Sequence, residues 1–333
     1  MSKGTRHTLV LGSLCILCAS ALGAKSPSPF LGRWALTIPG GGAGWLGVVE
    51  KEGQLSASIL WGGGSVVPVN AVKIEGDKLV VTRIQESQRG GKKSISTETI
   101  TATLDGSNLK LMTVTKRPDG SETKAANFTG KRIPPLPGKP DLAKVKFATP
   151  IVLFDGKNMD AWKLTDPGAK SGWSIENGIL VNKPVQPPDP KQHINYGNLR
   201  TVAEFEDFKL ALEVNADKGE NSGVYLRGLY EVQVCDSFGK KLDSHNMGGI
   251  YSRITPTVNA EKPPGEWQTM ELTLVDRHAT VVLNGKKIID NEPLLGCTGG
   301  ALTSDEFKPG PIYLQGDHTG VKYRNIVIAP VVK

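Results

Sequence analysis

Apolar and polar residues alternate with a period of two through most of the chain after residue 30. The pattern is clear at residues 34–38, 55–61, 78–84 and 109–116, and polar turns such as EGDK and DGSN separate such runs. Successive side chains of a β-strand point to opposite faces, so this period predicts strands. Hardly any stretch has the period of about 3.6 residues that marks an amphipathic helix. We therefore predict an all-β protein.

A proline-rich segment divides these runs into two groups. It begins with PPLPGKP at residues 134–140. Because proline restricts the backbone, we expect residues 134–148 to form a stiff, extended linker. The predicted domains on either side are residues 28–133 and residues 149–333.

The first domain has about seven strand-like runs, which predict a small antiparallel β-barrel or a sandwich. Its opening FLGRW, at residues 30–34, resembles the start of lipocalin-like barrels, although a core role for Trp34 is the simpler interpretation. Residues 28–133 contain no histidine and no tight acidic cluster. We expect this domain to be accessory and to take no part in catalysis.

The second domain has about a dozen short runs, among them residues 208–214, 248–254 and 267–276. The pair Asn284-Gly285 suits a type I′ hairpin turn. Many short strands without helices predict a jelly-roll β-sandwich of two sheets.

The first 24 residues have the layout of a secretory signal peptide. Lys3 and Arg6 precede an apolar run at residues 9–22, which ends among small residues. The run is short for a membrane span, although an uncleaved anchor is the alternative. We expect an exported protein, periplasmic, cell-surface or extracellular, with no membrane span after cleavage. Export permits a disulfide between Cys235 and Cys297, and two free thiols fit the sequence equally well.

Charge is unevenly spread along the chain. The formal net charge is +7, and residues 25–145 carry 17 Lys and Arg against 10 Asp and Glu. No basic helix or RNA-binding motif accompanies this excess, so nucleic acid is not expected as a partner. A mildly basic domain suits attachment to an acidic surface or polymer.

Residues 221–237, NSGVYLRGLYEVQVCDS, carry the most unusual strand faces. The alternation places apolar side chains on one face and a polar set on the other. That polar face and the residue just beyond it comprise Tyr225, Arg227, Glu231, Gln233 and Asp236. This composition is typical of a binding site. The alternative is a solvated sheet with a cross-strand ion pair between Arg227 and Glu231.

A second set of candidate residues follows residue 310. Tyr313 and Gln315 alternate with apolar neighbours, and Asp317 and His318 lie in the loop after them. Histidine is suited to acid–base chemistry or metal binding near neutral pH.

Several ordered motifs resemble the 3-keto-disaccharide hydrolase domain family over about residues 150–331. They are FDGKNMDAW (154–162), NSGVYLRGLYEVQVCDSFGK (221–240), GGIYSRITPTVNAEKPPGEWQTMELTLVD (248–276), VVLNGKKIIDN (281–291) and GPIYLQGDHTGVKYRNIVI (310–328). The resemblance implies a concanavalin A-like, or laminin G-like, jelly roll with a concave face that accepts sugars. It also implies cleavage of glycosides oxidised to a ketone at C3, by elimination and hydration, with a divalent metal in some members.

Such chemistry needs a base, a group that stabilises an enolate and a proton donor. We expect the catalytic set to be Arg227, Glu231, Asp236 and His318. We expect the substrate-binding set to be Tyr225, Gln233, Tyr313 and Gln315. Any divalent metal would be held by Glu231, Asp236 and His318, and no other cofactor is predicted. Many relatives have LQDHG where this chain has LQGDHTG, so either Asp317 or His318 takes the family role.

Three functions are compatible with this pattern. The first is an enzyme acting on 3-keto-glycosides. The second is a non-catalytic carbohydrate-binding or surface-display module, which would manage with aromatic and amide side chains. The third is ordinary glycoside hydrolysis by paired carboxylates, Glu231 with Asp236.

Overall fold

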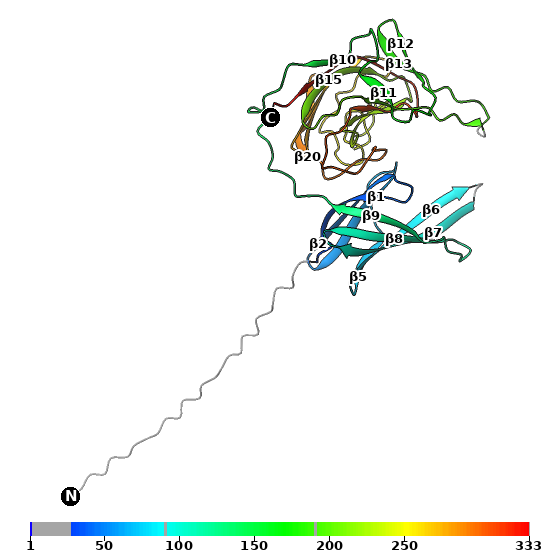
Figure 1. Ribbon diagram of the computed structural model, residues 1–333, viewed down its shortest axis with the longest axis vertical. Helices are drawn as coiled ribbons and strands as arrows, with labels where there is room; N and C mark the ends of the chain where they lie inside the picture. Colours follow the sequence, from blue (N-terminus) through cyan, green and yellow to red (C-terminus); the bar gives the residue numbers. More distant parts are fainter. Residues whose placement is uncertain (2–27, 90–91, 190–191, 333) are drawn as a thin grey trace.

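The computed structural model describes residues 1, 28–89, 92–189 and 192–332 of the protein (Figure 1). Within these ranges it has 22 strands and no α-helix, which confirms the all-β prediction. None of the described segments forms a helix of the length and apolar character that crossing a membrane requires. The predicted signal peptide, and with it the expected export, lies outside the described residues.

The N-terminal domain is one antiparallel sheet of nine strands, in the order β4-β3-β2-β1-β9-β8-β7-β6-β5. Most neighbours in the chain are neighbours in the sheet, but β4 and β5 form its two ends, and β1 pairs with β9. The strands are β1 (Gly32–Thr37), β2 (Ala43–Lys51), β3 (Gln54–Trp61), β4 (Val67–Pro68), β5 (Ala71–Glu75), β6 (Lys78–Arg89), β7 (Lys92–Asp105), β8 (Asn108–Lys116) and β9 (Ala126–Arg132). The choice between a closed barrel and a sandwich stays a prediction.

Trp34 lies at the centre of the N-terminal core, as the simpler interpretation expected. Its side chain is fully buried, and Nε1 donates a hydrogen bond to the Phe30 carbonyl over 2.9 Å. Leu46, Ile59 and Ile100 belong to the same cluster. Each comes from a different strand, so the apolar face of the meander closes over one core.

The C-terminal domain consists of two sheets. The larger has the order β12-β13-β22-β15-β18-β19-β20, with β10 paired to β22. Its strands are β10 (Ile151–Phe154), β12 (Trp173–Glu176), β13 (Ile179–Asn182), β15 (Phe208–Asn215), β18 (Gln268–Val275), β19 (His278–Leu283), β20 (Lys286–Pro293) and β22 (Val321–Pro330). The smaller has the order β11-β14-β21-β16-β17. Its strands are β11 (Trp162–Leu164), β14 (Leu199–Thr201), β16 (Asn221–Leu226), β17 (Tyr230–Cys235) and β21 (Tyr313–Leu314).

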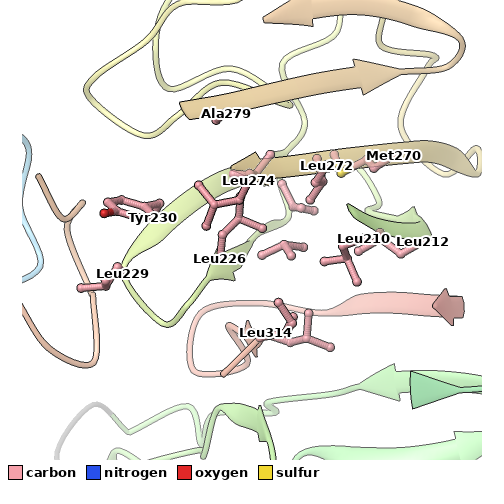
Figure 2. Packing of buried hydrophobic residues seen from close by; sticks show 14 of the residues in the cluster. Leu210, Leu212, Leu226, Leu229, Tyr230, Met270, Leu272, Leu274, Ala279 and Leu314 are labelled. Carbon is pink, nitrogen blue, oxygen red and sulfur yellow. The ribbon is translucent and has the colours of Figure 1, made fainter. Parts of the chain in front are cut away.

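The core of the C-terminal domain lies between these two sheets. Leu210 of β15 and Leu272 of β18 pack in one cluster with Leu226 and Leu314 of the smaller sheet (Figure 2). This is the sandwich that the alternation predicted. The turn between β19 and β20 has positive φ at Asn284 (50°) and at Gly285 (78°), as a type I′ hairpin requires.

The two domains are in contact. Ala35, Trp45 and Leu60 of the N-terminal domain are buried within the C-terminal hydrophobic cluster. Polar contacts join the domains as well, because Ser304 Oγ donates to the Leu36 carbonyl over 2.7 Å. The domain boundaries themselves stay a prediction.

Candidate active site

A pocket of about 270 Å³ lies over the smaller sheet of the C-terminal domain. Six of the eight side chains expected in the site line it: Tyr225, Glu231, Gln233, Tyr313, Gln315 and His318. They come from β16, β17, β21 and the loop after β21. The sequence therefore identified most of the pocket before its shape was known.

The register of three neighbouring strands explains this convergence. Tyr225 of β16 lies opposite Glu231 on one side and opposite Tyr313 on the other. Because strand faces alternate, Gln233 and Gln315 fall on the same face of the sheet. Val224 and Val232, with the opposite parity, are in the hydrophobic core.

Glu231 is a buried carboxyl group at the base of the pocket. Its side chain and backbone together are only 4% exposed. Burial raises the pKa of Glu231 to about 8, and the neighbouring charge of Asp317 acts in the same direction. The Tyr225 hydroxyl and the positive charge of His318 act in the opposite direction and are outweighed. Glu231 is therefore largely protonated near neutral pH.

His318 and Asp317 form a pair on the other side of the pocket. Nδ1 of His318 lies 2.7 Å from Oδ1 of Asp317. This hydrogen bond raises the pKa of His318 above its usual range. The loop is fixed from below, because Asn198 Oδ1 accepts hydrogen bonds from the backbone N–H groups of Gly316 and Asp317. Both candidates for the family role thus lie in the pocket. The hydrogen bond between them uses Nδ1 of His318, so Nε2 is the ring nitrogen that can exchange a proton with a ligand.

Tyr225 and Tyr313 stack on each other, with ring centroids 4.3 Å apart and an angle of 24° between the planes. The Tyr225 hydroxyl donates to the carbonyl of Gly299 over 2.8 Å. Burial raises the pKa of both phenols. Both hydroxyl groups therefore stay protonated and polar, and the stacked rings form a rigid wall.

Unpaired acceptors indicate what kind of ligand the pocket suits. Oε1 of Gln315 and Oδ1 of Asn221 are buried and have no hydrogen-bond partner among the described residues. Buried polar atoms are nearly always paired, so these two mark places for hydroxyl donors. Gln233 Oε1 instead accepts from the backbone N–H of Val234, so its amide NH₂ is the end that can donate to a ligand. A polyhydroxylated ligand meets both needs.

The sequence profile described as the 3-keto-alpha-glucoside-1,2-lyase-like domain matches residues 149–329, which is more than half of the chain. The chain belongs to this family. The matched range contains all six expected residues of the pocket, and the resemblance seen in the motifs is confirmed with nearly the same boundaries.

Solved structures with related folds are more distant. A candidate glycosyl hydrolase from Parabacteroides distasonis is 29% identical over 60% of this chain and 93% of its own, with a TM-score of 0.44. A non-specific endo-β-1,3(4)-glucanase is 10% identical over 59% of this chain and 92% of its own, with a TM-score of 0.33. A carbohydrate-binding module from Bacillus subtilis is 11% identical over 50% of this chain and 93% of its own, with a TM-score of 0.31. No curated protein matches the chain in sequence.

Two residues of the expected catalytic set do not line the pocket of this lyase-like domain. Arg227 lies in the turn between β16 and β17, with a φ of 57°, so the alternation of β16 ends before it. Its guanidinium donates to the carbonyls of Glu306 and Lys308 instead. Asp236 follows the end of β17, and its Oδ2 accepts a hydrogen bond from Gly219 N. The expected convergence of four charged residues is wrong for these two.

The three candidate metal ligands Glu231, Asp236 and His318 do not come together. Asp236 is outside the pocket, and Nδ1 of His318 is bonded to Asp317. In the described part of the chain, no three His, Cys, Asp or Glu side chains are grouped so that they could hold an ion. The residues present do not fit the predicted ligand set, and we derive no step through a metal. Cys235 and Cys297 are both free thiols, which resolves the alternative that the sequence left open.

Some lining residues were not expected. Asn221 has the same strand parity as Tyr225, so the alternation of β16 could have identified it. Tyr251 lies in a turn segment beside β17, where its backbone N–H donates to the Glu231 carbonyl. Gly63 belongs to the N-terminal domain, and no feature of the sequence associates it with this pocket.

Proposed function

We propose that this protein cleaves glycosides whose sugar carries a ketone at C3, by elimination followed by hydration. The observation that carries the proposal is the pairing, in one pocket, of a buried Glu231 carboxyl with pKa about 8 and the His318–Asp317 pair. Groups with perturbed pKa values in a concave polar site are typical of acid–base catalysis. The family to which the domain belongs supplies the substrate class.

The ketone makes this chemistry accessible to side chains alone. It acidifies the hydrogen on C2, so a base can remove that proton and form an enolate. The C1–O bond then breaks, the leaving oxygen takes a proton, and a C1=C2 double bond forms. Water next adds its hydroxyl group to C1 and a proton to C2. The net result is hydrolysis without any change in oxidation state.

We assign His318 as the base and Glu231 as the acid in the elimination step. The Glu231 carboxyl stays protonated up to a pH of about 8 and can therefore donate, whereas Nδ1 of His318 is hydrogen-bonded to Asp317 and leaves Nε2 to accept a proton. In the hydration step the roles exchange. The Glu231 carboxylate takes a proton from water, and the half-exposed imidazolium, after exchanging its proton with solvent, returns one to C2. Both groups end in their starting states.

The remaining side chains bind the sugar. The unpaired oxygens of Gln315 and Asn221 accept from sugar hydroxyls, and the NH₂ of Gln233 donates to the enolate oxygen or to a neighbouring hydroxyl. Asp317 holds the imidazole orientation, as carboxylates do in other histidine pairs. We also propose that the enzyme acts outside the cytoplasm, on the basis of the leader-like first 24 residues.

A comparison of two leaving groups tests the proposal. Wild-type protein should cleave methyl 3-keto-α-glucoside and 4-nitrophenyl 3-keto-α-glucoside, and it should leave the unoxidised parents intact. Glu231→Gln should lose about 10²–10⁴ in rate on the methyl glycoside, the usual contribution of a general acid. It should lose much less on the nitrophenyl glycoside, because nitrophenolate departs without a proton.

His318→Asn is the matched control, because loss of the base should slow both substrates equally. Unchanged turnover of the methyl glycoside by Glu231→Gln would refute the assignment. If the wild type binds these sugars without cleaving them, the pocket is that of a carbohydrate-binding module. Cleavage of the unoxidised parents would instead indicate ordinary glycoside hydrolysis.

A further inference from the structure

One wall of the pocket comes from the other domain. Residues 62–66 connect β3 to β4 in the N-terminal sheet, and Gly63 of this connection lines the pocket. The N-terminal domain is outside the range matched by the family profile. Its contribution to the pocket is therefore a property of this chain and not of the matched domain.

The connection lies directly against the pocket rim of the C-terminal domain. A Cβ atom on Gly299 would be 2.3 Å from the Gly64 carbonyl oxygen and 2.9 Å from that of Gly63. Gly300 N donates to the Gly62 carbonyl over 3.4 Å. Since Gly299 and Gly300 also line the pocket, backbone from both domains forms a single wall.

Side-chain contacts fix the connection in this place. Ser65 Oγ lies 2.9 Å from His245 Nε2, and Val66 N donates to Ser252 Oγ over 2.7 Å. The His245 ring packs edge-to-face on Tyr251, with centroids 4.7 Å apart, and Tyr251 lines the pocket. The position of Gly63 is thus determined by contacts on the residues that follow it.

This wall is on the Glu231 side of the pocket. The strand order β21-β16-β17 places the His318 loop at one side and Glu231 at the other. Tyr251 lies beyond β17, because its N–H bonds to the Glu231 carbonyl. If Glu231 protonates the leaving oxygen, the leaving group extends away from His318 and toward Gly63.

Gly63 leaves open space at this position. Its φ is outside the left-handed region, and a Cβ atom there would meet no atom within 4 Å. A side chain could therefore be accepted by the backbone and would project into free volume beside the pocket. Gly64 is the natural comparison, because it has the same freedom, with its nearest atom 3.9 Å away, but it does not line the pocket.

We propose that the N-terminal domain is part of the substrate site, and that Gly63 determines how large a leaving group the enzyme accepts. This inference rests on the proposed function, since it takes the position of the leaving group from the role of Glu231.

The test compares Gly63→Phe with Gly64→Phe in the full chain. The substrates are methyl 3-keto-α-glucoside and a 3-keto disaccharide with glucose as its leaving group. Gly63→Phe should lower kcat/KM on the disaccharide by about tenfold or more, and on the methyl glycoside by less than about threefold, as expected for a pocket that loses volume. Gly64→Phe should change both by less than about threefold.

The outcomes separate this inference from the proposed function. If the wild type is active and Gly63→Phe has the same effect on kcat/KM for both substrates as Gly64→Phe, the proposed role of Gly63 is wrong and the proposed function is unaffected. If the wild type cleaves neither substrate, calorimetric binding of the unoxidised disaccharide and methyl glucoside replaces turnover. Selective weakening of disaccharide binding in Gly63→Phe would then support the role of Gly63 in the substrate site but not the proposed cleavage reaction. Absence of both cleavage and binding in the wild type overturns both proposals.

Discussion

The carboxyl group of Glu231 lies in the space left by the missing side chain of Gly223. A Cβ atom on residue 223 would be 2.3 Å from Glu231 Oε1 and 2.9 Å from both Cγ and Cδ. Gly223 is on β16 and Glu231 on β17, two register positions away from direct opposition. The glycine thus permits a long acidic side chain to fold down onto the sheet beneath the sugar site.

Gly223→Ala should therefore displace the carboxyl group. Because Cβ contacts closer than 3.0 Å are not tolerated, Glu231 must rotate, while the backbone, which is outside the left-handed region, accepts alanine. We expect kcat/KM to fall by about 10- to 100-fold, since a misplaced catalytic group costs on that order. Gly138→Ala, in the linker with no atom near its Cβ, is the control and should remain fully active. Full activity of Gly223→Ala would mean that the carboxyl position is unimportant.

The dependence of kcat/KM on pH should be bell-shaped. The acidic limb reports His318, whose pKa is raised by Asp317, because the base must be neutral. The alkaline limb should lie near pH 8 and report Glu231, because the acid must be protonated. On the methyl glycoside, the wild type should show both limbs, and the residual activity of Glu231→Gln should keep only the acidic one. Asp236→Asn, outside the pocket, should keep both; an alkaline limb that survives in Glu231→Gln belongs to another group.

The raised pKa of Glu231 also predicts a cost in stability. The folded state holds this proton up to a pH of about 8, whereas the unfolded chain releases it near 4.5. The unfolded state therefore binds fewer protons across this window, and stability falls as pH rises through it. The upper bound is about 5 kcal/mol, at about 1.4 kcal/mol per pKa unit.

Glu231→Gln removes this titration and resembles the protonated acid in shape. Urea unfolding should show equal stability of the variant and the wild type near pH 4, and a more stable variant at pH 9. A wild type that is as stable as the variant at pH 9 would show that Glu231 is not desolvated in the folded protein.

A buried ion pair lies in the region where the two domains meet. Arg277 Nη1 lies 3.5 Å from Glu306 Oε2, and the side chains are 9% and 0% exposed. Arg277 also donates to the carbonyl of Pro134 in the linker. Removing the carboxylate leaves the Arg277 charge buried with only backbone carbonyls as partners, so Glu306→Ala should lower the free energy of unfolding by about 3–5 kcal/mol.

An exposed ion pair of the N-terminal domain provides the control for this measurement. Lys73 and Glu75 are 62% and 56% exposed, so Glu75→Ala should change stability by less than about 1 kcal/mol. A Glu306→Ala variant as stable as Glu75→Ala would indicate that the buried ion pair contributes little to folding.

Strand alternation was enough to predict the fold class and five pocket residues, whereas His318 was identified from the loop after Gln315 and from the family resemblance. In β16 and β17 the parity of Tyr225, Glu231 and Gln233 determines which face each occupies, and that parity is visible in the sequence. Arg227 was misplaced because the turn begins one residue earlier than the alternation indicates. The direction of a side chain in a turn depends on its backbone angles and not on its place in the alternation. The positive φ of Arg227 could not be predicted from the sequence.

The parts that could not be predicted depend on contacts between distant segments. Residues 248–254 look like a strand, yet among them only isolated bridges form, at Ile250 and Ile254. Gly63 reaches the pocket because Ser65 and Val66 are bonded to the other domain. Such contacts arise where segments that are distant in the sequence pack together, and the alternation within one segment does not predict them.

The most direct test of the proposed elimination is deuterium incorporation at C2. Wild-type protein would be incubated with methyl 3-keto-α-glucoside in deuterated water, and the released sugar analysed at early times by NMR, with free 3-ketoglucose as the control for later exchange. Elimination and hydration predict one solvent deuterium at C2 of the product, gained faster than in the control, and no cleavage of the unoxidised methyl glucoside. A product that retains its original C2 hydrogen, or equal cleavage of the unoxidised glycoside, would contradict the mechanism.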